Sequence, residues 1–196
     1  MKKILASTIL AAGVLTTAAQ AEVKVGLGVD VFNTYSNPAA TSGPGLGDTL
    51  GSTPVVRVPV TFGAWRVEPR IAYISGSTNN DNIKTTDTAS FLALGIGGYY
   101  KLANEKNYNM FVGGHIDSYG LTLNSGVSGA KDTEVSGLQV GAVVGVEYFM
   151  VENVFSLSSE LGYAYTSTSV DPGSPAKTID STQIHPITSV TFRYYF

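Results

Sequence analysis

Eight segments of this sequence alternate between apolar residues and small or polar ones, and this period of two constrains the fold more than any other feature. In the last segment, one face carries Val190, Phe192 and Tyr194 while the other carries Thr191 and Arg193. Such alternation predicts β-strands that each have one apolar face. The predicted strands span residues 22–35, 54–62, 66–75, 89–102, 108–123, 134–150, 154–168 and 184–196.

The segments between these strands alternate between long and short. The long ones are rich in Gly, Ser, Thr, Asn and Pro, and an antiparallel sheet places them all at one end. Short turns at one end and longer loops at the other are typical of transmembrane barrels, in which they are periplasmic and extracellular. The long connections are 37–53, 76–88, 124–133 and 169–183, and the short ones are 63–65, 103–107 and 151–153.

Two prolines and one parity change predict irregular pairing. Pro59 and Pro69 lack the N–H that a ladder needs, so we expect a bulge or a broken hydrogen bond near each. In the fifth strand, Leu121 and Leu123 fall on the polar face. This predicts either a bulge near Gly120 or a strand that has left the bilayer at that point.

The composition of the polar face distinguishes a transmembrane barrel from a soluble one. A soluble barrel has an apolar interior and a charged exterior. Here the polar faces consist mainly of Gly, Ser, Thr and Ala with isolated charges, and only 14% of all residues are charged. These small side chains suit the narrow interior of an eight-stranded barrel. The sequence therefore predicts an all-β fold, an eight-stranded antiparallel transmembrane β-barrel.

The N-terminal residues have the features of a secretory signal peptide. A short apolar run follows Lys2 and Lys3, and Ala21 ends an A-x-A cleavage site. The run is shorter than the ~20 apolar residues that a membrane-spanning helix needs. We therefore predict a signal peptide at 1–21 and one barrel domain at 22–196.

Several classes of function are disfavoured by composition. The sequence has no cysteine, which excludes a lipoprotein anchor, disulfides and thiolate metal sites. The net charge is −3 and there is no basic stripe, so we predict no nucleic-acid partner. His115 and His185 are too far apart in the sequence to form a metal motif, and we predict neither a metal nor another cofactor.

The charged residues of the polar faces are predicted to point into the lumen. Burying unpaired charges costs several kcal/mol, so these residues are expected to pair. They form either a structural network that fills the barrel or the lining of a narrow ion pathway. The predicted lumen residues are Lys24, Asp30, Arg57, Glu68, Arg70, Lys101, His115, Asp117, Glu147, Glu160 and Arg193.

Aromatic residues gather near the predicted short turns, as in the girdle that lies at the periplasmic interface of transmembrane barrels. The girdle residues are Phe62, Trp65, Tyr100, Tyr108, Tyr148 and Phe155. The last strand adds Phe192, Tyr194 and a terminal Phe196 on one face. This ending resembles the C-terminal strand of bacterial outer-membrane barrels, in which the terminal Phe is the signal read by the barrel-assembly machinery.

Residues 22–196 as a whole resemble the superfamily of small eight-stranded outer-membrane β-barrels, which includes OmpA-like, OmpX-like and opacity-like proteins and often carries the label porin family. The resemblance implies a monomer in the outer membrane of a Gram-negative bacterium, in contact with outer-membrane lipid and lipopolysaccharide. It also implies a structural or adhesin-like role at the cell surface, through extracellular loops whose ligand is unknown. The alternative is a small pore for ions or small solutes.

A lipid-modifying enzyme is a third and more distant reading. His115 and Asp117 share a strand face, so an oriented imidazole is conceivable. Barrels that modify lipid A use His with Ser and an acidic residue, but Ser118 falls on the opposite face. We therefore predict no enzymatic activity.

Overall fold

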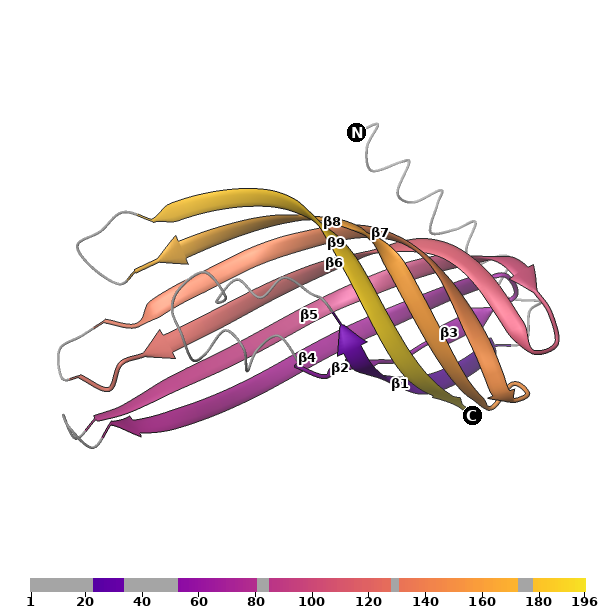
Figure 1. The fold of residues 1–196 in the computed structure, drawn as a ribbon, viewed down its shortest axis with the longest axis horizontal. Coiled ribbons are helices and arrows are strands. Elements are labelled where there is room, and N and C mark those ends of the chain that lie inside the picture. The colour runs from indigo at the N-terminus through magenta and orange to yellow at the C-terminus, as the bar shows by residue number, and fades with distance from the viewer. Residues whose placement is uncertain (1–22, 34–52, 81–84, 128–130, 173–177) are drawn as a thin grey trace.

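The computed structural model describes residues 23–33, 53–80, 85–127, 131–172 and 178–196, and the regular elements of these ranges are β-strands (Figure 1). The predicted signal peptide lies outside the described residues. Within the described ranges, no helix is long and apolar enough to cross a membrane. The strands are β1 (Val23–Asn33), β2 (Val55–Arg57), β3 (Val60–Phe62), β4 (Trp65–Asn80), β5 (Thr85–Asn104), β6 (Tyr108–Asn124), β7 (Thr133–Val151), β8 (Phe155–Asp171) and β9 (Ile179–Tyr195).

The strands form one closed antiparallel barrel. Each strand from β4 to β9 pairs with the next, β9 pairs with β1, and β1 pairs with both β2 and β3. Because β2 and β3 occupy the same position between β1 and β4, they are two halves of one interrupted strand. Counted with β2 and β3 as one strand, the barrel therefore has eight strands, and the predicted fold class is confirmed.

The interruption between β2 and β3 lies at Val58 and Pro59, opposite Pro69 of β4. The register is the same on both sides of it, so the ladder is broken without a bulge. The Val58 N–H still donates to the Pro69 carbonyl at 2.9 Å, and the Gly26 N–H donates to the Pro59 carbonyl at 2.9 Å. On its other side Pro69 pairs with Ile96 in an unbroken register. The predicted broken hydrogen bond is present near both prolines, because Pro59 has no N–H to donate to Gly26 and Pro69 has none to donate to Val58. The pairing of β4 with β5 stays regular at Pro69.

The predicted bulge near Gly120 is wrong. Gly120 pairs in regular register with Leu92 of β5 and Ser136 of β7. Leu121 and Leu123 simply continue on the inner face, where an apolar cluster receives them. The register shifts that do occur on β5 and β7 lie beside short turns, between Lys101 and Ala103 and between Phe149 and Val151.

The strands at the loop end are longer than predicted. β4 continues to Asn80 and β5 begins at Thr85, so most of the predicted loop 76–88 is paired strand. Likewise, β9 begins at Ile179 instead of residue 184. Ser, Thr and Asn in these segments suggested loops, but strand preference depends on the neighbours with which a strand pairs. Figure 1 shows β4 to β9 running well beyond β1, β2 and β3 at this end.

The two faces of the barrel have opposite polarity. The outer face carries exposed apolar side chains along each of the eight strands, such as Leu94, Val140 and Leu161. The inner face carries most of the buried polar and charged side chains, including Arg57 and Glu68, which are both 0% exposed. A polar interior behind an apolar exterior is the arrangement of a barrel that spans a lipid bilayer.

Candidate functional site: a charge network in the lumen

A network of charged side chains fills the lumen toward the end with the short turns. Its members come from six strands that are far apart in the sequence, and every one is at most 3% exposed. Closure of the barrel brings them together, because each occupies an inward position on its strand. The network consists of Asp30, Arg57, Arg66, Glu68, Glu147, Glu160 and Arg193.

Arg193 lies at the centre of the network. Its Nε is 2.8 Å from Glu68 Oε1, and its Nη2 is 3.3 Å from both Glu68 Oε2 and Glu160 Oε1. Its Nη1 donates to the Ser158 hydroxyl. The contact with Glu68 has the bidentate geometry in which a planar guanidinium binds a carboxylate. A single side chain of β9 thus ties β4 and β8 together across the lumen.

Arg57 forms a second junction. Its Nε and Nη2 each lie 2.8 Å from an Asp30 carboxylate oxygen, and its Nη1 lies 3.1 Å from Glu160. Nη1 is also 3.3 Å from Glu68, which Arg57 therefore shares with Arg193. Because β2 is only three residues long, these ion pairs fix the position of its single inward charge.

Arg66 is held by both charge and aromatic rings. Its Nη1 lies 2.8 Å from Glu147 and its Nε lies 3.1 Å from Glu68. The guanidinium carbon is 4.6 Å from the ring centre of Tyr99 and 4.4 Å from that of Phe111. Cation–π contacts of this kind gain strength where water is excluded.

Hydroxyl groups add further hydrogen bonds to the carboxylates of the network. Ser156 and Tyr195 donate to Glu147 at 2.6 and 2.8 Å, Thr191 donates to Asp30 at 2.7 Å, and Ser189 donates to Glu160 at 3.1 Å. Buried ion pairs offset their desolvation only when such additional hydrogen bonds are present. The small polar residues of the inner face are therefore part of the network.

A second group lies nearer the loop end. Arg70 pairs with Asp117, and His115 Nδ1 lies 2.6 Å from Asp117 Oδ2. Their side chains are 2%, 12% and 1% exposed for Arg70, Asp117 and His115. This group carries the one His–Asp arrangement that the sequence analysis considered for catalysis. Ser118 is exposed on the outer face of β6, so it does not complete a serine-containing triad.

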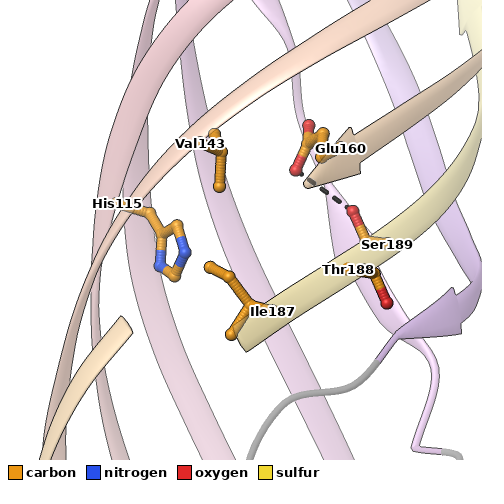
Figure 2. A pocket seen from close by; sticks show the side chains of 6 residues that line it. All are labelled: His115, Val143, Glu160, Ile187, Thr188 and Ser189. Atoms are coloured by element: carbon orange, nitrogen blue, oxygen red, sulfur yellow. Dashed lines mark hydrogen bonds between the residues drawn. The ribbon is translucent and has the colours of Figure 1, made fainter. Parts of the chain in front are cut away.

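Between the two groups lies a cavity of about 10 Å³ (Figure 2). Glu160 and Ser189, joined by a 3.1 Å hydrogen bond, form one side of it, and His115, Val143 and Ile187 form the other. A space of this size holds at most about one water molecule. The cavity itself is therefore too small for a solute larger than water.

The structure places the predicted lumen residues on the inner face. Nine of them belong to the two groups above, while Lys24 and Lys101 are half-buried near the turn end. Arg66 was missed because it was taken as the start of its strand. Its position in the sequence was informative, since it shares the parity of Glu68 and Arg70. In the described ranges, no three His, Asp or Glu residues gather in a way that could hold a metal ion.

The predicted girdle residues are neighbours on the outer face. Trp65 pairs with both Phe62 and Tyr100, and the Trp65 and Tyr100 ring centres are 5.0 Å apart. Tyr108 pairs with Tyr148. Around the same end, Phe155 pairs with Tyr194 and stacks on Phe192 at 5.8 Å, and Phe196 lies 5.5 Å from Tyr194.

These features define a transmembrane β-barrel whose lumen is crossed by an ion-pair network. No protein-family model matches the sequence, and no curated protein sequence is significantly similar to it. Among solved structures, Neisserial surface protein A aligns over 89% of this chain and 97% of its own, with 14% identity and a TM-score of 0.51. A major outer membrane protein of Thermus thermophilus aligns over 89% and 99%, with 12% identity and a TM-score of 0.46. The likeness to the Neisserial protein confirms the predicted fold, that of small outer-membrane barrels.

Proposed function

We propose that this protein resides in the bacterial outer membrane and acts there as a structural or surface-interaction protein, with a lumen that does not conduct. The observation that carries the proposal is the buried network of Arg57, Glu68, Glu160 and Arg193, in which each side chain is at most 3% exposed. A pore would need these charges to face water, because water lets an ion enter and leave. Because these charges are buried and paired with one another, they support a network that plugs the lumen.

The resemblance to outer-membrane barrels and the apolar exterior support the location. The Neisserial protein is called a surface protein in its own description, and this chain shares its fold. A barrel that does not transport solutes can act on the external medium only through the surface at its loop end. Surface interaction is therefore favoured over the pore, and the predicted lipopolysaccharide contact and the absence of enzymatic activity remain part of the proposal.

The plug is tested by the conductance of refolded protein in a planar bilayer. We expect no discrete current steps from protein whose folding is established by the faster migration of unboiled samples in gels. Protease protection of the same preparation shows whether the barrel has inserted. Reproducible unitary steps from folded, inserted protein would contradict the proposal and favour the pore.

The surface role is tested on cells. We expect cells that carry the protein to attach more strongly than cells lacking it to at least one of a panel of surfaces coated with defined proteins or polysaccharides. The matched control is a strain producing the same barrel with the long connections replaced by Gly-Ser segments. Equal attachment by all three strains across the panel would contradict a role in surface interaction.

A further inference from the structure

The polarity of the sheet inverts toward the loop end. On the outer face, the apolar residues of β5, β7 and β9 end at Leu92, Leu138 and Ile184. Beyond this level the outward residues are polar on all six strands from β4 to β9. They are Ser75, Ser77, Thr86, Thr88, Ser90, Thr122, Asn124, Glu134, Ser136, Ser167, Ser169, Asp171, Asp180 and Thr182.

The inner face changes in the opposite sense at the same level. One row of cross-strand neighbours there is apolar on six consecutive strands: Ile74, Phe91, Leu121, Val135, Val170 and Ile179. Leu121 is 1% exposed and Val135 is 6% exposed, and Phe91 and Val170 pack against them. We call residues 74–80, 85–91, 119–124, 133–137, 167–171 and 179–183 the upper sheet.

An apolar inside with a polar outside is the polarity of a barrel in water. The polar outer face of the upper sheet would lose its hydration in a bilayer. Tyr73, Tyr163 and Tyr165, which are 62%, 66% and 48% exposed, lie on the outer face just below it, where tyrosines mark a membrane interface. The membrane boundary therefore crosses the strands well before they end, with up to about 23 Å of β4 beyond Tyr73 at ~3.3 Å per residue.

The two parts of the sheet have separate cores. Below the boundary, the outer face contacts lipid, and the lumen contains the ion-pair network and an apolar cluster of Tyr99, Phe111, Val143, Ala164 and Ile187. Above it, Leu121 and its neighbours bury apolar surface in water, and Tyr119 bonds to Thr168 at 2.6 Å across the inner face. Regions with separate sources of stability open separately, as hydrogen exchange shows in many proteins.

We propose that the upper sheet stands in the external water around its own apolar core and can open locally while the membrane-embedded barrel stays folded. The inference rests on the outer-membrane location in the proposed function, but on neither the surface role nor the non-conducting lumen. It extends the surface available to an external partner from the loops to the upper sheet, and it gives that surface a stability of its own.

The boundary is tested by labelling single cysteines, which the cysteine-free sequence makes simple. In intact cells we expect a membrane-impermeant maleimide to label Ser90→Cys and Ser136→Cys. The matched controls, Ile96→Cys and Val140→Cys, lie on the outer face of the same two strands within the apolar band and should be labelled only after denaturation. Protection of Ser90→Cys and Ser136→Cys until denaturation would place the upper sheet in lipid and overturn the proposal.

Local opening is tested with Leu121→Ala. We expect amide exchange in the upper sheet to become about 30-fold faster or more, the effect of a lost buried leucine on a local opening equilibrium. The temperature at which the folded gel band disappears should stay unchanged. Ile187→Ala, in the apolar cluster below the boundary, should lower that temperature. If Leu121→Ala lowers the temperature as much as Ile187→Ala does, the two parts form one unit and the proposal fails. Val135→Ala replaces Leu121→Ala in this comparison if the Leu121→Ala protein does not fold.

Discussion

The charged side chains of the lumen network depend on one another. Four carboxylates, from Asp30, Glu68, Glu147 and Glu160, share three guanidinium groups, from Arg57, Arg66 and Arg193. Removing one partner of a buried ion pair leaves the other charge without compensation, which is more costly than the loss of the contact itself. Individual residues of the network should therefore have large effects on stability, unlike charges on the surface.

Arg193→Ala is expected to lower the free energy of unfolding by about 3–5 kcal/mol, because Glu68 and Glu160 stay buried with less positive charge beside them. The measurement is a urea titration of protein refolded in lipid vesicles, followed by the fluorescence of Trp65, the only tryptophan. Lys106→Ala is the control, since its 3.5 Å pair with Glu152 is exposed and worth less than about 1 kcal/mol. Equal effects of the two changes would argue against the network as a source of stability.

At the scale of a single strand, β5 shows how glycine makes room for the lumen groups. Gly95 faces inward, and a Cβ there would overlap the Asp117 carboxylate that pairs with Arg70 and His115. Gly98 faces outward, and a Cβ there would meet nothing within 4 Å. The two glycines lie three positions apart on one strand, yet only the inward one is required by its neighbours.

Gly95→Ala is therefore expected to destabilise the barrel by roughly 1–3 kcal/mol, the usual cost of forcing extra volume into a packed interior. Gly98→Ala should be neutral or slightly stabilising, because its methyl group adds apolar surface to the lipid face. Urea midpoints of the two variants, compared with that of the unchanged protein, measure the difference. A Gly95→Ala variant as stable as the unchanged protein would show that Asp117 can move without loss of stability.

The whole molecule has an outer apolar band bounded by two sets of aromatic residues. On β4, Trp65 and Tyr73 both face outward, and eight positions separate them. At ~3.3 Å per residue and a strand tilt of about 40°, this corresponds to a band of roughly 20 Å. Bacterial outer membranes are thinner than the average bilayer, so the barrel matches the membrane in which we place it.

Stability should consequently depend on bilayer thickness. We expect the protein to fold faster and resist more urea in vesicles of lipids with 12-carbon chains than in vesicles with 18-carbon chains, because a thicker bilayer would cover polar residues of the upper sheet. Refolding yield on unboiled gels and urea midpoints provide the comparison. Greater stability in the thicker bilayer would place the polar upper sheet inside the membrane and contradict the boundary at Tyr73.

The period of two predicted which side chains face inward, and the structure places them there, including Asp30 and Arg193 at opposite ends of the chain. The same rule also covers Arg66, which lies in the predicted strand 66–75 with the parity of Glu68 and Arg70 but was not assigned to the lumen. What the alternation could not provide is the partner of each charge. Glu68 is 125 residues from Arg193, and their contact exists only because the barrel closes.

Local alternation and connection lengths are enough to set the number of strands, their direction and the polarity of each face, because all three follow from residues that are neighbours in the chain. The ends of the strands and the pairing of the lumen charges depend instead on the assembled barrel. Strand ends such as Asn80 and Ile179 are fixed by pairing with a neighbouring strand, not by their own polar composition. Leu121 likewise breaks the pattern in sequence, yet in the closed sheet it packs against Val135 and Phe91 in a second core. Burial depends on which distant residues meet, and that information lies in the fold.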